Sequence, residues 1–158
     1  MTTSLKRAGT VLLSVLLLCT LALSAGAASK LRVGVKFWKT GSDKESMANS
    51  GIDTSREASL TRQSNGTYTL TLPIQQVSKM GVTGSLSGLT IGDVTYDGTL
   101  TGDFEKGTAV LTIKNLPASV LTGSDVNRSI TVTCNIQMDM SLLGELNTTA
   151  RMCIWNKK

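Results

Sequence analysis

Histidine is absent from this 158-residue chain, and aromatic residues are scarce. Without histidine, a Ser-His-Asp triad, a histidine general base and a histidine metal site are all excluded. The two Trp, two Tyr and two Phe residues are not interleaved with Lys or Arg, which argues against nucleic-acid binding. Carboxylates are few, and no Asp/Asn run has the spacing of a calcium loop. These absences predict that the protein is not an enzyme.

The first 27 residues have the features of a secretory signal peptide. Lys6 and Arg7 precede an apolar run, residues 11–23, that is short for a membrane span, and small residues follow it. Cleavage is expected after Ala27, which leaves residues 28–158 as one domain with no later apolar segment that could span a bilayer. Without Lys6 and Arg7, 14 basic residues remain beside 11 acidic ones. We expect a secreted, extracellular protein, either released or held at the cell surface by another component.

The clearest periodic segment is residues 129–140, where apolar and polar side chains alternate without a break. An apolar residue stands at every even position from Ile130 to Met140, which is the period of a half-buried β-strand. At about 3.3 Å per residue this strand would be roughly 40 Å long, about twice the usual length. We therefore expect its end to project beyond the sheet.

Further strands are predicted at residues 31–38, 57–63, 67–75, 82–94, 99–104, 108–114 and 148–156. Turns are expected at Asn65-Gly66, Asp97-Gly98 and Lys106-Gly107. The one helix-compatible piece is residues 44–49, with Ser42 or Asp43 as its N-cap. About eight strands and one short helical turn near the N-terminus predict an all-β, immunoglobulin-like antiparallel β-sandwich, with an open barrel as the alternative.

Two cysteines remain after signal-peptide removal, Cys134 and Cys153. If the last hairpin turns near Leu143 and Gly144, these residues lie opposite each other on antiparallel strands. Opposed Cα atoms are about 4.5–5.5 Å apart, which overlaps the range for a disulfide. An even pair in an oxidising compartment is a disulfide candidate, and two buried free thiols are the alternative.

Methionine is the other sulfur-bearing residue of interest. Met140 and Met152 are expected to fill gaps in the core, and Met80, next to Gly81 at a turn, to pack at a rim. Met47 differs because it lies in the polar segment 43–51, where no strand pattern requires a buried apolar residue. Met138 stands near the projecting end of the long strand. For Met47 and Met138, the sequence leaves two alternative roles open: packing in the core, or binding a ligand.

Several short motifs, in order along the chain, resemble the NEAT (near-transporter) haem-binding domains, and most of all the Shp-type cell-surface haem-binding proteins. They are Trp38 with Asp43-Lys44-Glu45-Ser46-Met47-Ala48-Asn49, then Asn65-Gly66-Thr67-Tyr68-Thr69-Leu70-Thr71-Leu72, then Gly81-Val82-Thr83-Gly84-Ser85-Leu86-Ser87-Gly88-Leu89, and finally Ala150-Arg151-Met152-Cys153-Ile154-Trp155. The resemblance covers residues 31–155. It implies an immunoglobulin-like sandwich that binds haem between a lip helix and the last hairpin, and relays it between surface proteins toward an importer's binding protein.

Many members of this family hold the iron through a tyrosine in a Tyr-x-x-x-Tyr motif on the last strand, but no tyrosine follows Tyr96 here. The Shp-like branch uses two methionine thioethers instead. The matching positions are Met47 on the lip and Met138 on the last hairpin. A thioether is a known axial ligand of haem and raises the potential of the iron.

The resemblance thus implies a non-covalent, b-type haem held for iron acquisition, with supporting residues around it. Trp38 and Ile136 would line the porphyrin face, Ser46 would hydrogen-bond at the rim, and Lys44 would meet a propionate. The alternative function is an immunoglobulin-like adhesion or interaction module without a cofactor. A carbohydrate-binding sandwich is also open, although such sites usually display more exposed aromatic residues.

Overall fold

The computed structural model describes residues 28–139 and 145–158, and these form an all-β structure with three short 3-10 helices. The predicted signal peptide and Met140 lie outside the described residues. The strands are β1 (Lys30–Trp38), β2 (Ala58–Arg62), β3 (Tyr68–Pro73), β4 (Val77–Lys79), β5 (Val82–Ile91), β6 (Val94–Thr101), β7 (Val110–Leu116), β8 (Ile130–Met138) and β9 (Glu145–Asn156). The 3-10 helices are η1 (Met47–Gly51), η2 (Ala118–Val120) and η3 (Val126–Arg128).

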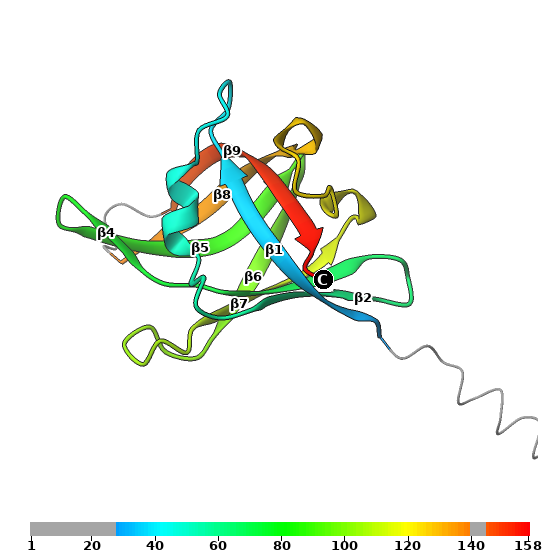
Figure 1. Ribbon diagram of the computed structural model, residues 1–158. Helices are drawn as coiled ribbons and strands as arrows, with labels where there is room; N and C mark the ends of the chain where they lie inside the picture. The colour runs from blue at the N-terminus through cyan, green and yellow to red at the C-terminus, as the bar shows by residue number, and fades with distance from the viewer. Residues whose placement is uncertain (1–27, 140–144) are drawn as a thin grey trace, which may run out of the picture.

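Eight of these strands close into a ring, in the order β5-β6-β7-β3-β2-β1-β9-β8, because β8 pairs again with β5. Each pairing is antiparallel, and β4 joins the ring only through β5 (Figure 1). The prediction of an all-β, immunoglobulin-like fold is confirmed. The strands belong to one closed sheet, however, and not to two separate sheets.

A continuous apolar core fills the ring. Alternate residues of the strands point inward, and the largest side chains with almost no exposure are Phe37, Leu60, Leu70, Leu72, Leu89, Leu111, Ile113, Leu116, Met152 and Ile154. Met152 therefore packs in the core, as expected. No helix within the described residues has the length and hydropathy needed to cross a bilayer.

Two turn predictions have different outcomes. Asn65-Gly66 connects β2 to β3, with Gly66 at φ 84° and the Asn65 carboxamide oxygen accepting from the Thr67 amide at 3.0 Å. The expected turn at Asp97-Gly98 is wrong, because both residues lie inside β6. Gly98 is needed there for close packing: a Cβ would lie 2.4 Å from Leu111 Cδ1.

The final hairpin has another register than the sequence suggested. Cys134 lies opposite Thr148, five residues before Cys153, and Cys153 pairs with Lys36 of β1. A displacement by an odd number of residues moves a side chain to the other face of the sheet. Cys134 consequently points into the core, whereas Cys153 Sγ lies 3.5 Å from the Asp125 carbonyl oxygen. The predicted disulfide is wrong, and both cysteines are buried free thiols.

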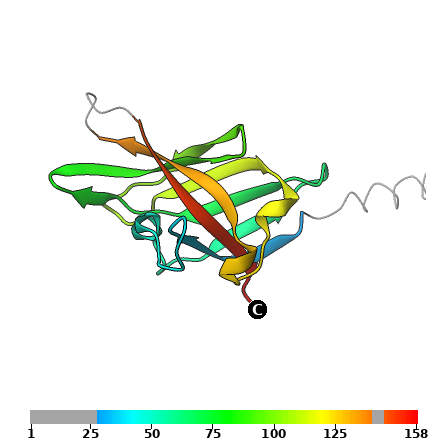
Figure 2. The same ribbon diagram turned by 90° about the horizontal axis from the view of Figure 1, so that it is seen from above.

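The helical turn and the long strand are also displaced from their expected positions. The 3-10 helix η1 begins at Met47 with Ser46 as its N-cap, so Lys44 lies before the helix, in a bend of the preceding loop. The strand expected over residues 129–140 is described as β8 only to Met138, and its partner β9 is the longer strand, with twelve residues. Figures 1 and 2 show the β4–β5 hairpin and the far ends of β8 and β9 extending to one side of the ring, with η1 nearby.

Candidate functional site

The short helix η1 is held in place by the side chain of Asn49. Its amide nitrogen donates to the Phe37 carbonyl oxygen at 2.7 Å and to the Ser46 carbonyl oxygen at 3.0 Å. Its carbonyl oxygen accepts from the Phe37 backbone amide at 2.8 Å. The carboxamide oxygen thus gives the Phe37 backbone amide its hydrogen-bond partner, whereas the Phe37 carbonyl oxygen is shared with the Ser46 backbone amide, which donates to it at 3.0 Å. Ser46 Oγ caps the helix by accepting from the Ala48 amide at 3.3 Å.

The loop that leads into η1 is fixed by Arg151 of β9. The Arg151 Nη2 atom donates to the Ser42 carbonyl oxygen at 2.7 Å and to Asp43 Oδ1 at 2.8 Å. Its Nε atom donates to the Lys39 carbonyl oxygen at 3.2 Å. The last strand and the core strand β1 therefore both position the lip, through residues that are distant in sequence.

An apolar pocket of about 460 Å³ opens between η1, the β4–β5 hairpin and the ends of β8 and β9. Most of its lining is aliphatic, thioether or glycine, and Lys79 is the only charged residue among its described walls. The lining residues are Met47, Ala48, Gly51, Val77, Lys79, Met80, Val82, Gly84, Ser85, Leu86, Ile136, Met138, Leu146 and Thr148. The size and the apolar character of this pocket are typical of a binding site for a small hydrophobic ligand or cofactor.

Of the predicted site residues, Met47, Met138 and Ile136 come together in this pocket. Met138 and Ile136 lie on the same face of β8 as Cys134, so the pocket continues the inner face of the sheet beyond the packed core. Met47 reaches the pocket from η1, and its side chain remains 55% exposed. Met47 and Met138, from distant segments, thus supply two of the three thioethers that, among the described residues, line this apolar space, and Met80 is the third.

Glycine at position 84 makes room for the Met138 side chain. A Cβ on Gly84 would lie 2.9 Å from Met138 Sδ, 3.1 Å from the Gln137 carbonyl oxygen and 3.2 Å from Ile136 Cγ2. Contacts this short force neighbouring atoms to move, so any side chain here would displace the sulfur and fill the pocket. The sequence motif that contains Gly84 gave no sign of this role.

The β4–β5 turn supplies two residues to the site. The sequence did not point to Lys79, and it suggested a different role for Met80. Lys79 Nζ donates to Met47 Sδ at 3.5 Å, so an ammonium group contacts the thioether. Met80 lines the pocket at the tip of the hairpin, but it is 95% exposed and adopts a φ of 54°. The expectation that Met80 packs at a rim is therefore wrong. The short strand β4, which had no recognisable pattern, brings both residues to the site.

The other predicted site residues lie outside the pocket lining. Trp38 lies beneath Lys36, whose Nζ is 4.5 Å from the centre of its ring, and Trp38 Nε1 is buried without a hydrogen-bond partner among the described residues. Lys44 is exposed in the loop before η1. Ser46 is buried, and its hydroxyl serves as the N-cap of η1. The structure thus separates residues that shape the lip from those that line the space beneath it.

The Cys134 thiol lies in the packed core, apart from the thioethers of the pocket. Burial raises the pKa of Cys134 to about 12, so this thiol stays protonated at neutral pH. Within the described part of the chain, no three His, Cys, Asp or Glu side chains gather into a metal-binding group. Thioether sulfur is consequently the soft donor that the apolar pocket presents.

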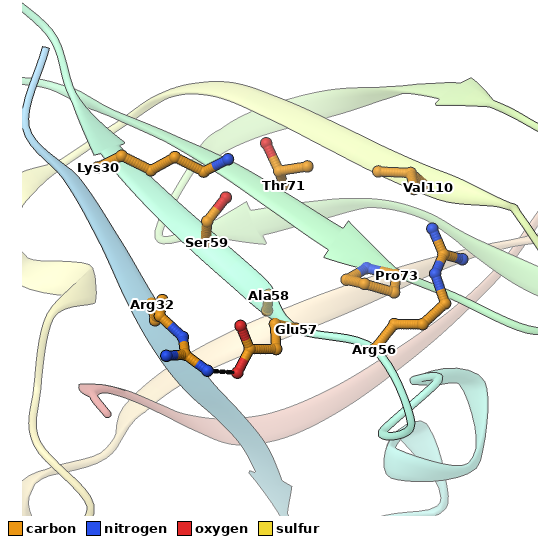
Figure 3. Close-up of a pocket in the computed structure, with 9 residues that line it drawn as sticks. All are labelled: Lys30, Arg32, Arg56, Glu57, Ala58, Ser59, Thr71, Pro73 and Val110. Atoms are coloured by element: carbon orange, nitrogen blue, oxygen red, sulfur yellow. Dashed lines mark hydrogen bonds and ion pairs between the residues drawn. The ribbon is translucent and has the colours of Figure 1, made fainter. Parts of the chain in front are cut away.

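A second hollow, of about 330 Å³, lies on the outer face of β1, β2, β3 and β7 and is lined mostly by polar and charged residues; we call it the polar hollow (Figure 3). Arg32 and Glu57 form an ion pair across it. The Arg56 guanidinium donates to the carbonyl oxygens of Ala109 at 2.9 Å and Gly107 at 3.0 Å. Three of the four described charged side chains of this hollow, Arg32, Arg56 and Glu57, are therefore engaged with partners from the protein itself, and Lys30 is the fourth.

Comparisons with known proteins agree with the fold. No protein-family model matches the chain, and no curated protein matches it. Among solved structures, the chain is similar to the NEAT5 domain of IsdX2, a B. anthracis hemophore, in complex with heme, with a TM-score of 0.53 and 10% sequence identity. A mutant of the same domain in complex with heme gives the same two values. The similarity covers 84% of this chain and 98–99% of those domains, and shows that the chain has the NEAT-type immunoglobulin-like fold.

Proposed function

We propose that this protein binds haem in the apolar pocket, with the thioethers of Met47 and Met138 as axial ligands of the iron. The observation that supports this proposal is that these two residues, from η1 and β8, line the same apolar space. The two solved domains of similar fold are in complex with heme. An adhesion module has no need for two thioethers around an apolar hollow, so the cofactor-free alternative is the weaker one.

The residues around the pocket fit such a group. Aliphatic side chains, among them Ile136 and Leu146, offer the porphyrin a water-poor surface. Thioethers are soft, neutral donors that favour reduced iron and raise its potential. Neutral ligands on a partly open pocket would hold the iron loosely enough for release. This suits a protein that takes up haem and passes it on, as opposed to a store or an enzyme.

We propose that the protein acts outside the cell. A signal peptide over residues 1–27 would export residues 28–158 as one haem-binding domain. Its partners would then be haem and other extracellular or surface haem-transfer proteins, including an importer's binding protein. The role proposed is the capture or relay of haem for iron acquisition outside the cytoplasm.

A haemin titration of residues 28–158 tests the proposal. We expect a sharp Soret band, and a low-spin spectrum after reduction because both axial positions are filled. Met47→Leu and Met138→Leu keep the side-chain volume but remove the sulfur, so each variant should shift the Soret band and lower the reduction potential. Met80→Leu is the matched control at the same pocket and should retain the wild-type spectrum. Absence of a Soret band from the wild type would refute haem binding, and unchanged spectra of both ligand variants would refute thioether ligation.

A further inference from the structure

Lys79 has an unusual position for a charged residue. It is the only charged side chain among the described walls of the apolar pocket, and it stands at the pocket opening on the β4–β5 hairpin. None of the ion pairs within the described residues includes Lys79. Its one side-chain partner is the thioether of Met47, at 3.5 Å from Nζ.

This partner satisfies the ammonium group poorly. An ammonium carries three strong donors, whereas a thioether sulfur is a weak acceptor. A carboxylate would be a far better partner, since hydrogen bonds between two charged groups are short and strong. A ligand that enters the pocket with an acidic group at its edge would therefore draw Lys79 away from Met47.

The same contact affects the sulfur. When Nζ donates to Met47 Sδ, it engages one of the two lone pairs of the sulfur and places a positive charge beside the atom that a metal cation would have to approach. From this juxtaposition we infer that Lys79 selects ligands bearing a carboxylate, and that its movement to the carboxylate frees Met47 to bind the iron. This inference rests on the proposed haem-binding function and adds to it a specificity residue. The ligand class is a flat apolar molecule with a carboxylate at its edge, which haem supplies through its propionates.

The experiment compares haemin with haemin dimethyl ester, in which both propionates are blocked. Affinities are measured by Soret titration for the wild type, Lys79→Ala, Lys79→Arg and the control Lys114→Ala, whose exposed lysine lies on β7 away from the pocket. Lys79→Ala should bind haemin about 3- to 10-fold more weakly than the wild type, as for one lost charge-assisted contact. It should bind the dimethyl ester as tightly as the wild type or more tightly, because the ammonium no longer competes for Met47. Lys79→Arg should keep the preference for haemin.

The outcomes separate the two proposals. If the wild type binds neither ligand, the proposed function is refuted, and the role of Lys79 with it. If the wild type binds haemin but Lys79→Ala matches Lys114→Ala with both ligands, only the role of Lys79 is refuted. An equal loss of affinity for both ligands would likewise refute it, since a general disturbance of the pocket would explain that result. Equal thermal unfolding midpoints of the two alanine variants show that the fold is intact.

Discussion

The apolar pocket and the polar hollow lie on opposite faces of the sheet, and they differ in the chemistry of the residues that line them. Residues Ser59 and Thr71 of the polar hollow alternate along their strands with the core residues Leu60 and Leu72, so that hollow lies on the outer face. The apolar pocket continues the inner face, beyond the point where Cys134 ends the packed part of β8. One hollow is a depression between charged surface side chains, and the other is the unfilled end of the core.

The difference indicates where binding takes place. In the polar hollow, three of the four charged side chains already have partners: Arg32 pairs with Glu57 (Figure 3), and Arg56 donates to backbone carbonyls. In the apolar pocket, the sulfur atoms face an open space with a single weak contact, from Lys79 to Met47. A ligand that bound Arg32, Arg56 or Glu57 at the first hollow would have to displace existing partners, whereas a ligand at the second hollow would gain new ones.

Valine substitutions in the two hollows should give the largest contrast. Gly84→Val places a side chain against Met138 Sδ and Ile136 Cγ2, and so fills the apolar pocket. If the cost of overpacking, about 1–3 kcal/mol, falls on the bound state, haemin affinity drops by roughly 5- to 150-fold. Ser59→Val, the matched change in the polar hollow, should leave haemin affinity unchanged. Haemin titrations of both variants make the comparison, and equal effects would mean that the haem site is wrongly placed.

Removing the attachment of η1 should have an intermediate effect. Asn49→Ala removes the side-chain partner of the Phe37 backbone amide and one of the two partners of the Phe37 carbonyl oxygen, which keeps the Ser46 backbone amide. Loss of such partly buried partners costs about 1–3 kcal/mol, to be measured by chemical denaturation. The control Asn127→Ala changes an exposed asparagine on η3, away from both hollows. If the two variants proved equally stable, the carboxamide of Asn49 would not be what holds the lip.

The smallest effect is expected at the polar hollow, and it concerns pH. The hydrogen bond from Arg32 holds the pKa of Glu57 below its usual value of 4.5. A lowered pKa in the folded state means that the pairing stabilises the protein above that pH range and is lost as the pH falls through it. In Arg32→Ala the pKa of Glu57 should rise toward 4.5, as followed by NMR titration of the side-chain carboxyl. Glu57 in Gly84→Val should titrate as in the wild type, and a shift there would show that the two hollows are coupled.

The sequence predicted the strand pattern well because alternation and turn chemistry are local properties. It predicted that Met47, Ile136 and Met138 belong to a site, through the resemblance, and the structure brings them to one pocket. It failed at the last hairpin, since alternation defines a strand but not its pairing, and the turn residues allow more than one register. The two cysteines consequently lie on opposite faces of the sheet.

Other residues of the site could not be found from the sequence for a different reason. Asn49 and Arg151 act on backbone groups far away along the chain, and such contacts leave no pattern in a single sequence. Lys79 lies on a three-residue strand that is too short to show a period. Trp38 stood beside the lip motif in sequence, but side chains in a strand alternate, so it points away from Phe37 and the core.

The closure of the ring of strands affects how easily copies of the protein can associate through the edges of their sheets. Exposed strand edges are templates for the addition of other chains, and a closed sheet removes them. Among the described strands, β4 alone has one neighbour, and it offers only the three residues Val77–Lys79, with a lysine at its end. A short edge that ends in a charge is a poor template for aggregation. This protein can therefore expose an open apolar pocket at high local concentration without other copies of the chain adding strands to its sheet.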